Sequence, residues 1–341
     1  MKLIIDIMSG DNAPVETLLG VDRAAKQSFS DGVDFLLVGD ENKIKAIAQE
    51  KKIDISRYEI RHTDEVLTME DDPMSVMRAK KNSSLAIALK MLATGEGDAL
   101  VSAGNTGALF CGASLIVKRV KGINRAAIGA IIPLTKPFIL LDSGASVKPN
   151  EDYMHGFAIM GSAYMRAFYG VESPRVALVN NGAEEHKGTE LQQATYVKLK
   201  DSSFVNFVGN VEGNKLPFDV CDVAVSDGFT GNILLKTIEG MGKMMSNELK
   251  TMFKSGLGGI LAYLLMSKKL KAFKKRFDAK EHGGAPILGI SKTVIKAHGS
   301  SDAKAFSNAI RQAVQCVNTG VVDVIAGEAA KLEEAKAVSE E

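Results

Sequence analysis

Two stretches of the chain carry the same pattern: Val101-Ser-Ala-Gly-Asn-Thr-Gly-Ala-Leu109 and Val225-Ser-Asp-Gly-Phe-Thr-Gly-Asn-Ile233, in which Val, Ser, Gly, Thr and Gly recur in register. Each follows a short apolar run and opens an amphipathic segment, which is the order of a strand, a turn and a helix. One interpretation is that two turns use the same capping chemistry, since glycine permits tight turns and Thr or Asn caps helices. The other is that they are two facing loops that bind an anion.

The alternation of strand-like and helix-like segments continues along nearly the whole chain, as in βαβ units around a mostly parallel, buried sheet. Strands are predicted at Lys2 to Met8, Asp34 to Val38, Ala99 to Ser102, Ala127 to Pro133, Phe138 to Asp142, Arg175 to Val179, Val205 to Val208 and Val220 to Ser226. Helices are predicted at Val15 to Gln27, Ser75 to Ala93, Asn105 to Val117, Tyr153 to Phe168, Thr189 to Leu199, Phe229 to Phe253 and Ser301 to Ile325. We therefore expect an α/β fold in which residues 1–341 form a single large unit.

Composition excludes several classes of protein. The 341 residues are 45% hydrophobic and 24% charged, enough to bury a sizeable core. With 42 Lys and Arg against 41 Asp and Glu, the formal net charge is +1, so the surface as a whole has no nucleic-acid signature. Three widely spaced cysteines match no zinc or disulfide pattern and favour a reducing, cytoplasmic setting. The apolar start is too short for a signal peptide, and no run reaches the roughly 18 to 20 uncharged apolar residues of a membrane span.

Four glycine-containing loops are placed between a predicted strand and a helix: Ser9 to Pro14, Ser102 to Gly107, Asn180 to Gly188 and Ser226 to Asn232. Backbone N–H groups and the helix dipole can hold an anion at such a junction, and in α/β sheets these loops gather at the carboxyl ends of the strands. No Walker A loop occurs, and no dinucleotide fingerprint follows the first strand. The loops together predict a phosphate or phosphate-bearing ligand, although each alone could be only a turn.

Three polar residues near these loops are candidates for chemistry. Lys187, in Glu184-Glu-His-Lys-Gly188, could hold a phosphate or polarise a carbonyl, or belong to a solvated loop whose charges cap the next helix. Asp142 ends an apolar strand and is either a site residue or a cap for backbone N–H groups. His298 follows a strand-like run and precedes a helix that we expect Ser300 or Ser301 to cap; it is either a site residue or a structural histidine with satisfied hydrogen bonds. The histidines and carboxylates form no metal pattern, so we expect no metal and no cofactor.

A separate feature is an apolar stretch, Gly256 to Met266, followed by a basic one, Ser267 to Lys280, with seven basic residues and one acidic residue, a net charge of +6. We expect a helical insertion at about 245–282. It resembles an interfacial membrane anchor attracted to anionic lipid; the alternative is a dimer interface with a solvated basic helix. The predicted membrane or partner contacts are Leu257, Ile260, Leu261, Leu264, Leu265, Lys268, Lys269, Lys271, Lys274, Lys275 and Arg276.

Several longer motifs resemble those of the bacterial phosphate acyltransferases, the PlsX family of fatty acid and phospholipid synthesis. They are Asp6-Ile-Met-Ser-Gly-Asp-Asn-Ala-Pro14, Val101-Ser-Ala-Gly-Asn-Thr-Gly107, Leu141-Asp-Ser-Gly-Ala145, Glu184-Glu-His-Lys-Gly188, Gly209-Asn-Val-Glu-Gly213, Asp227-Gly-Phe-Thr-Gly-Asn232 and Ala297-His-Gly-Ser-Ser-Asp-Ala303. They span nearly the whole chain. Three residues depart from the usual pattern: Ser9 stands in place of Gly, Ser146 in place of Asn, and Asn181 in place of an apolar residue.

The resemblance implies transfer of a long-chain acyl group from acyl carrier protein to inorganic phosphate, giving acyl phosphate. It also implies a three-layer αβα body like that of isocitrate and isopropylmalate dehydrogenases and phosphotransacetylases, and a homodimer. Such proteins are cytosolic and membrane-associated, and pass acyl phosphate to a membrane glycerol-phosphate acyltransferase. The alternatives are a short-chain phosphotransacetylase that uses coenzyme A, and a non-enzymatic membrane-associated scaffold.

A thioester is already activated, so phosphate can attack it directly if the protein holds the polyanion and stabilises the developing oxyanion. We expect Lys187 to supply the cation, Asp142 or Asp227 to accept a proton from phosphate, and His298 to donate to the oxyanion or the sulfur. Cys111, inside an apolar helix, is interpreted as a core residue and not as an acyl-enzyme nucleophile. The basic stretch could dock the acidic carrier protein, anionic lipid or both. Expected phosphate or substrate contacts are Asp11, Ser102, Gly104, Asn105, Thr106, Gly107, Glu184, Gly228, Thr230, Gly231 and Asn232.

Overall fold

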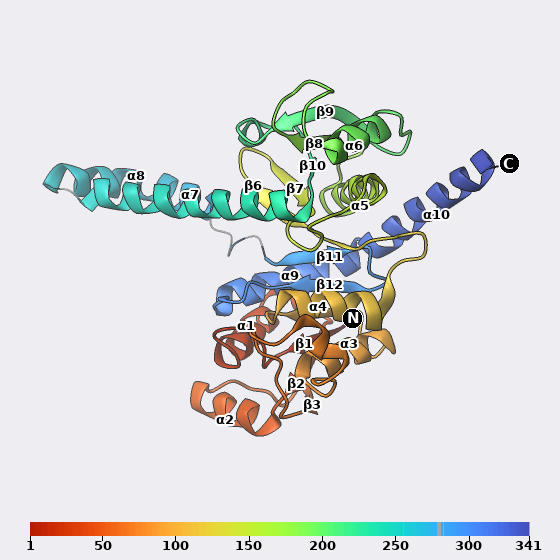
Figure 1. The fold of residues 1–341 in the computed structure, drawn as a ribbon. Coiled ribbons are helices and arrows are strands. Elements are labelled where there is room, and N and C mark those ends of the chain that lie inside the picture. The colour runs from red at the N-terminus through yellow and green to blue at the C-terminus, as the bar shows by residue number, and fades with distance from the viewer. Residues whose placement is uncertain (255, 278–280, 282, 341) are drawn as a thin grey trace.

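The computed structural model describes residues 1–254, 256–277, 281 and 283–340, and contains two sheets (Figure 1). The seven-stranded sheet has the order β3-β2-β1-β4-β12-β11-β5, and the five-stranded sheet has the order β6-β7-β10-β8-β9. The strands are β1 (Lys2–Asp6), β2 (Asp34–Gly39), β3 (Glu59–His62), β4 (Ala99–Ser102), β5 (Ala127–Ile128), β6 (Ala130–Pro133), β7 (Pro137–Leu141), β8 (Arg175–Asn180), β9 (Asn206–Glu212), β10 (Val223–Val225), β11 (Ala285–Leu288) and β12 (Thr293–Lys296). Most neighbouring strands are parallel, so the predicted α/β class is confirmed.

The first lobe has helices on both faces of the seven-stranded sheet. Its helices are α1 (Val15–Ala25), α2 (Glu41–Lys51), α3 (Ser84–Ala93), α4 (Thr106–Gly112) and α9 (Ala303–Asn318). Successive residues of β1 serve opposite faces: Leu3 lies in the core formed with α1 and α9, and Ile4 lies in the core formed with α3. This alternation gives the lobe its three layers, helix, sheet and helix.

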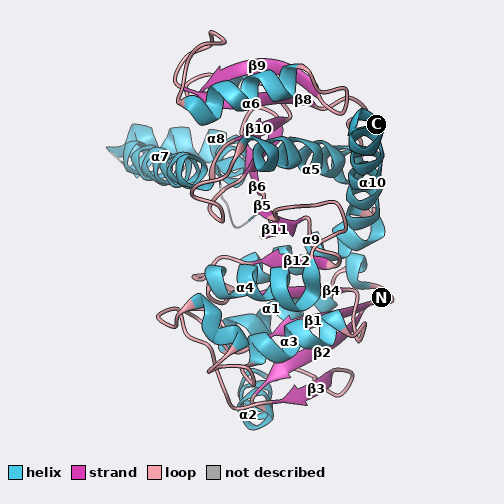
Figure 2. Ribbon diagram, turned by 45° about the vertical axis from the view of Figure 1, so that its right-hand side comes forward, coloured by secondary structure: helices cyan, strands magenta, loops and turns pink. Residues whose placement is uncertain are grey.

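The second lobe is built on the five-stranded sheet, with α5 (Glu151–Tyr169) and α6 (Glu190–Lys200) beside it and α7 (Gly228–Lys254) over its other core (Figure 2). Only the start of α7 packs on this sheet, through Leu234, Leu235 and Ile238. The helix then leaves the body of the protein and pairs with α8 (Gly256–Phe277), and the two form a projecting arm. A last helix, α10 (Val321–Glu340), packs against α5 and α9 and extends outward on the opposite side.

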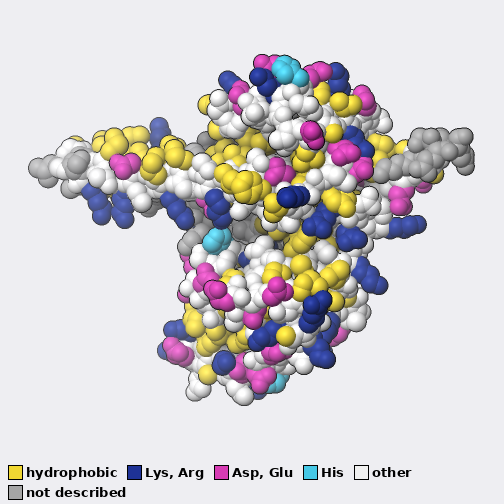
Figure 3. Space-filling model, viewed as in Figure 1, with side chains coloured by type: hydrophobic (Ala, Val, Ile, Leu, Met, Phe, Trp, Pro, Cys, Tyr) yellow, Lys and Arg dark blue, Asp and Glu magenta, His cyan; other side chains and the backbone are white. Residues whose placement is uncertain are grey.

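The arm is amphipathic along α7. Figure 3 shows apolar side chains gathered along one side of the arm and basic side chains along the other. The exposed apolar residues of α7 are Phe229, Ile233, Met241, Met244, Met245 and Met252. No helix in the part of the chain that the structure describes is long and apolar enough to cross a membrane.

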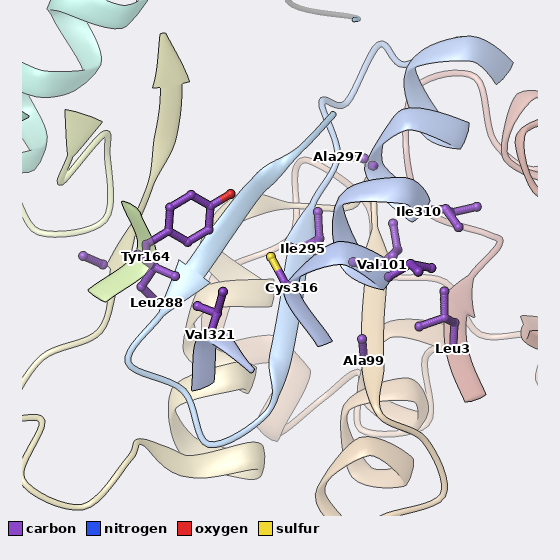
Figure 4. Close-up of a cluster of buried hydrophobic side chains, with 14 of the residues drawn as sticks. Leu3, Ala99, Val101, Tyr164, Leu288, Ile295, Ala297, Ile310, Cys316 and Val321 are labelled. Carbon is purple, nitrogen blue, oxygen red and sulfur yellow. The ribbon is translucent and has the colours of Figure 1, made fainter. Parts of the chain in front are cut away.

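A shared core joins the two lobes. Figure 4 shows Tyr164 of α5 beside Leu288 of β11, with Cys316 of α9 and Val321 of α10 completing the cluster. Tyr164 is fully buried and its hydroxyl accepts a hydrogen bond from Gln312 Nε2 at 3.3 Å. The second lobe therefore packs on the C-terminal helices of the first.

All eight predicted strands are present, but three expectations about segments are wrong. Ala127 to Pro133 is divided at Gly129 into β5 and β6, which belong to different sheets. Ser75 to Ala93 is not one helix, because Ser83 caps a separate helix that starts at Ser84. Ser301 to Ile325 is divided at Gly320, whose positive φ of 62° ends the regular helix. The strands β3, β11 and β12 and the helix α2 were not in the predicted set.

Candidate functional site

The first cluster of site residues lies at the carboxyl ends of β1, β4 and β12, three adjacent parallel strands. The loop after β1 is tied to the loop after β12, since Asp11 N donates to Gly299 O at 2.9 Å and Asn12 Nδ2 donates to Ser301 O at 3.3 Å. The structure thus brings together the loops at 9–14, 102–107 and 297–302. Asp302, and not Ser300 or Ser301, caps α9, because its carboxylate accepts from the backbone of the first turn.

Asn105 holds the loop after β4 in place. Its Oδ1 accepts from Ala108 N at 3.0 Å and caps α4, while its Nδ2 donates to the carbonyls of Met69 and Asp71 at 3.0 and 3.1 Å. The amide is therefore engaged on both sides. Thr106 follows it and is exposed at the first turn of α4.

Two glycines of this loop are set by close packing. A Cβ on Gly104 would meet Ser9 Cβ at 2.9 Å and Ser102 Oγ at 3.2 Å, and a Cβ on Gly107 would meet Pro73 Cγ at 2.7 Å. A side chain at Gly104 would push the loops after β1 and β4 apart, and one at Gly107 would push the loop after β4 away from Pro73. Gly104 thus allows the backbones of two predicted anion-binding loops to approach each other.

Beneath these loops lies Asp6, a buried carboxylate that sequence analysis did not select. Its Oδ1 accepts from Ser84 Oγ and its Oδ2 accepts from Ser102 Oγ, both at 2.7 Å. Burial nevertheless raises the pKa of Asp6 above its ordinary value. A carboxylate at the end of an otherwise apolar strand is the signal that could have identified it, as it did for Asp142.

The second cluster lies at the carboxyl ends of β7, β10 and β8, which are adjacent parallel strands of the other sheet. Asp142 is fully buried and accepts backbone N–H groups from the residues that surround it. The donors are Ile128, Gly144, Ala145 and Ser146, at 2.6 to 3.2 Å. Burial raises the pKa of Asp142, and its oxygens organise the loop at 142–146.

The N-terminus of α7 packs directly on that loop. Asp227 caps the helix, since its Oδ1 accepts from Phe229 N at 3.0 Å and Thr230 N at 2.9 Å. A Cβ on Gly228 would meet Ser146 N at 2.8 Å, and a Cβ on Gly231 would meet the carbonyl oxygen of Asp142 at 2.0 Å. The two predicted motifs at 141–145 and 227–232 therefore form one packed unit, with Asn232 exposed beside Gly144.

Lys187 lies in the loop after β8, the next strand of the same sheet. The loop folds on itself, since Lys187 N donates to Glu184 O and Asn180 Nδ2 donates to Lys187 O, both at 3.1 Å. The Lys187 side chain is half-buried, whereas Glu184 is exposed. The neighbouring Glu185 forms an ion pair with Lys200, with 2.8 Å between Glu185 Oε1 and Lys200 Nζ. This part of the loop therefore agrees with the alternative prediction of a solvated loop.

Helix α7 connects the two clusters electrostatically. The charge of Lys236 on α7 acts to lower the pKa of both Lys296 and His298, which belong to the first lobe. Glu239 and Lys243, also on α7, act on His298 as well. Because such charge effects require proximity, this part of α7 lies near the loops at the carboxyl ends of the first sheet.

The tautomer and charge of His298 make it a neutral hydrogen-bond donor. Its Nδ1 accepts from Ser300 N at 3.2 Å and lies 2.9 Å from Ser300 Oγ. Since a backbone N–H can only donate, the neutral ring carries its hydrogen on Nε2. Burial is the largest cause that lowers the pKa of His298, followed by the charge of Lys236. The imidazole is therefore neutral near pH 7.

The cysteines are not activated. Cys111 is half-buried, and burial raises the pKa of its thiol despite the nearby charge of Arg125. Burial raises the pKa of Cys221 and of Cys316 to about 12. Among the described residues, no group of three or more His, Cys, Asp or Glu could hold a metal ion.

The predicted membrane or partner contacts lie on α8. Leu261, Leu264 and Leu265 are 60%, 65% and 80% exposed, and Lys268 and Lys269 are exposed on the following turn. The remaining predicted contacts belong to the same helix, but their side chains lie outside what the structure describes; they are Leu257, Ile260, Lys271, Lys274, Lys275 and Arg276.

Comparison with known proteins gives a consistent result. The model of the family described as "Fatty acid synthesis protein" matches residues 1–324. The phosphate acyltransferase of Acetivibrio thermocellus is 42% identical over 335 residues, covering 98% of each chain, and that of Dictyoglomus turgidum is 43% identical over 323 residues, covering 94% of this chain and 95% of its own. Among solved structures, a phosphotransacetylase from Streptococcus pyogenes (TM-score 0.58) and the EutD phosphotransacetylase from Staphylococcus aureus (0.56) are each 16% identical, with 93% of this chain and 94% of theirs covered. At that identity the structures establish a shared fold.

Proposed function

The chain belongs to the fatty acid synthesis protein family and is an acyltransferase; on that premise we propose that it transfers a long-chain acyl group from acyl carrier protein to inorganic phosphate. The product is acyl phosphate, for use in phospholipid synthesis. The observation that supports the proposal is that each lobe has a set of strand-end loops, and that Lys296 and neutral His298 of the first lobe lie within the electrostatic range of Lys236 on α7. Loops of this kind bind phosphate, and cationic or hydrogen-bond-donating side chains stabilise an oxyanion.

The proposed reaction is a direct displacement. A phosphate oxygen attacks the carbonyl carbon of the thioester, forming a C–O bond and a tetrahedral oxyanion. The oxyanion collapses, the C–S bond breaks, and the thiolate leaves with the electron pair. Because a thiol has a pKa of about 8.5, the thiolate is a good leaving group and is then protonated. The raised pKa of Cys111 supports this route over one through an acyl-cysteine.

In this proposal the predicted residues divide the work. Lys187 and the N–H groups of the loops that carry Asn105 and Asn232 hold phosphate and the oxyanion. Asp227, whose Oδ1 caps α7, uses Oδ2 to accept a proton from phosphate. His298 donates from Nε2 to the oxyanion or the sulfur. Asp142 acts through the loop it holds, since both of its oxygens accept backbone N–H groups.

The projecting arm supports two further proposals about partners. The exposed apolar side of α7, which includes Phe229, Ile233 and Met241, is suited to a second copy of the chain in a homodimer. The exposed Leu264 and Leu265 of α8 are suited to shallow insertion into a membrane interface. Such placement would deliver acyl phosphate to a membrane glycerol-phosphate acyltransferase. The basic residues of α8 would attract anionic lipid, the acidic carrier protein, or both.

The test is release of free thiol by the purified protein from palmitoyl-acyl carrier protein, with and without inorganic phosphate, and with palmitoyl-coenzyme A as the control donor. We expect release that requires phosphate and prefers the carrier-protein thioester. Preference for a short acyl-coenzyme A would replace the proposal with a phosphotransacetylase activity. Thiol release that is independent of phosphate would contradict both.

A further inference from the structure

A row of buried polar side chains crosses the three central strands of the first sheet. In register, Asp6 of β1 pairs with Ser102 of β4, and Ser102 pairs with Lys296 of β12. Register partners on parallel strands point to the same face, so the three side chains form one row at the carboxyl ends of the strands. They are 0%, 0% and 7% exposed. Lys296 is thus a cation held inside the protein directly beneath the loops of the candidate site.

Lys296 has no contacting counter-ion among the described residues. The oxygens of Asp6 accept from Ser84 and Ser102, and no carboxylate of the described chain lies within 4.0 Å of Lys296 Nζ. The ammonium instead donates to the carbonyl oxygens of Ala103, at 3.3 Å, and Ala297. An ammonium has three hydrogens, so one is left for another acceptor. A buried cation without a partner is costly, and an anion in contact would remove much of that cost.

The two carbonyls that Lys296 contacts show where that anion would lie. Ala103 opens the loop that contains Asn105, and Ala297 precedes His298, so the ammonium lies where these two loops leave the sheet. Lys236 of α7 belongs to the other lobe, and its charge acts to lower the pKa of Lys296. Lys236 is half-exposed and paired with Glu239 at 2.8 Å.

We propose that Lys296 is a phosphate-binding residue: its ammonium and the two loops that it contacts form a clamp for the phosphate dianion, and afterwards for the phosphate end of acyl phosphate. This inference rests on the proposed function and deepens it, because it names the residue that binds the nucleophile, inorganic phosphate. The clamp positions phosphate between the loops that carry Asn105 and His298.

The clamp has a characteristic pH dependence. Burial lowers the pKa of Lys296 to about 8, against the charges of Asp11 and Asp6, which act to raise it, while Lys236 acts to lower it further. Above that pH the amine loses its charge and with it the attraction for phosphate. Bound phosphate would raise the pKa of Lys296, since a nearby anion stabilises the charged ammonium form. Phosphate affinity should therefore fall between about pH 8 and pH 9.5.

The experiment measures binding of radiolabelled inorganic phosphate by equilibrium dialysis, and phosphate KM and kcat by thiol release, for the wild type, Lys296→Gln and Lys296→Arg. Lys292→Gln is the matched control, because Lys292 precedes the same strand at its other end. We expect Lys296→Gln to weaken phosphate binding and raise the phosphate KM about tenfold or more, with a smaller effect on the KM for the acyl donor. Lys296→Arg should keep binding and abolish its decline at high pH, since arginine stays charged. Lys292→Gln should match the wild type.

Unchanged phosphate binding in Lys296→Gln would overturn the inference. A purely structural role predicts that Lys296→Gln raises the KM for phosphate and for the acyl donor equally and that Lys296→Arg restores neither, so this result would also overturn the inference. If Lys296→Gln does not fold, the wild type decides: phosphate affinity that is constant from pH 7 to pH 9.5 overturns the clamp. If the wild type binds phosphate through Lys296 but releases no thiol, the binding site stands and the proposed function fails. The two can therefore fail separately.

Discussion

The contact between α7 and the loop at 142–146 makes Gly231 the most sensitive position of the candidate site. A Cβ at Gly231 would lie 2.0 Å from the carbonyl oxygen of Asp142, and real Cβ contacts are essentially never closer than 3.0 Å. Gly231→Ala must therefore separate helix and loop by at least 1.0 Å. Backbone atoms stand on both sides of this contact, so no side-chain rotation can relieve it.

The cost of that separation follows from the bonds at the junction. Gly228 N donates to Ser146 O at 2.8 Å, and a shift of this size would stretch that hydrogen bond beyond 3.5 Å. Its loss costs about 1 kcal/mol, and overpacking adds about 1–3 kcal/mol. Alanine returns up to about 1 kcal/mol through its helix propensity. We expect a net loss of about 2 kcal/mol in the free energy of unfolding.

The same helix offers a matched control. A Cβ on Gly240 would meet nothing within 4 Å, so Gly240→Ala should raise the free energy of unfolding by up to about 1 kcal/mol. Urea unfolding measures both variants, and phosphate-dependent thiol release measures activity. Gly231→Ala should lose at least about tenfold in kcat/KM, because displacement of the loop misplaces the site, while Gly240→Ala keeps its activity. Equal stability and activity in the two variants would refute the packing argument.

Three further predictions follow from other parts of the molecule. Lys187→Gln should lower kcat/KM for thiol release by about tenfold or more, whereas Lys200→Gln, which removes the partner of Glu185 near the same loop, should change it less than twofold; equal rates for Lys187→Gln and the wild type would remove Lys187 from the mechanism. Leu265→Glu on α8 should reduce cosedimentation with vesicles containing anionic lipid and leave thiol release in solution unchanged, and undiminished cosedimentation would contradict membrane insertion of this turn. Burial acts to raise the pKa of Asp222, but hydrogen bonds from Arg175 and Lys136 lower it to about 2. The charged carboxylate therefore stabilises the fold above its unfolded pKa of 3.8, and this contribution is lost as the pH falls toward 2. Acid titration of the unfolding free energy of the wild type and Asp222→Asn checks this, with a smaller decline expected in the variant.

Local sequence patterns predicted the elements well where one strand and one helix share a turn. Asn105 caps α4, in agreement with the expectation that Thr or Asn caps these helices, because capping depends on residues within one turn of each other. The cap of α7 is instead Asp227, which was predicted as a proton acceptor. Patterns of this range also identified Ser102 and Asp142 as residues at the ends of strands. They left open whether Asp142 is a site residue or a cap for backbone N–H groups, and its oxygens do accept from backbone N–H groups. The patterns did not reveal that Ile128 is one of the donors, since it reaches Asp142 only through the arrangement of the strands.

Sheet order was beyond such patterns. The short strands β11 and β12 are the last in the sequence, yet β12 lies beside β4 in the middle of the first sheet. Pairing of Lys296 with Ser102 joins segments almost two hundred residues apart, and no local periodicity encodes it. The sequence therefore gave no reason to select Lys296 as a site residue, although it lies two positions before His298. Its burial comes from its place in the sheet, and not from its neighbours in the sequence.

The topology of the chain explains why the net charge of the protein did not predict the local charge at the candidate phosphate site. The chain enters the second lobe at β6, passes along the arm, and returns through β11 to place Lys296 under the loop that β4 began. Lys236, near the start of α7, and Lys296, beyond the arm in sequence, thus belong to different lobes, and the charge of Lys236 acts to lower the pKa of Lys296. A net charge of +1 describes a surface on which opposite charges balance, whereas a dianion responds to the few cations within about 10 Å of it. The topology, by burying Lys296 beneath the loops of three adjacent strands, creates a local field that the composition does not have.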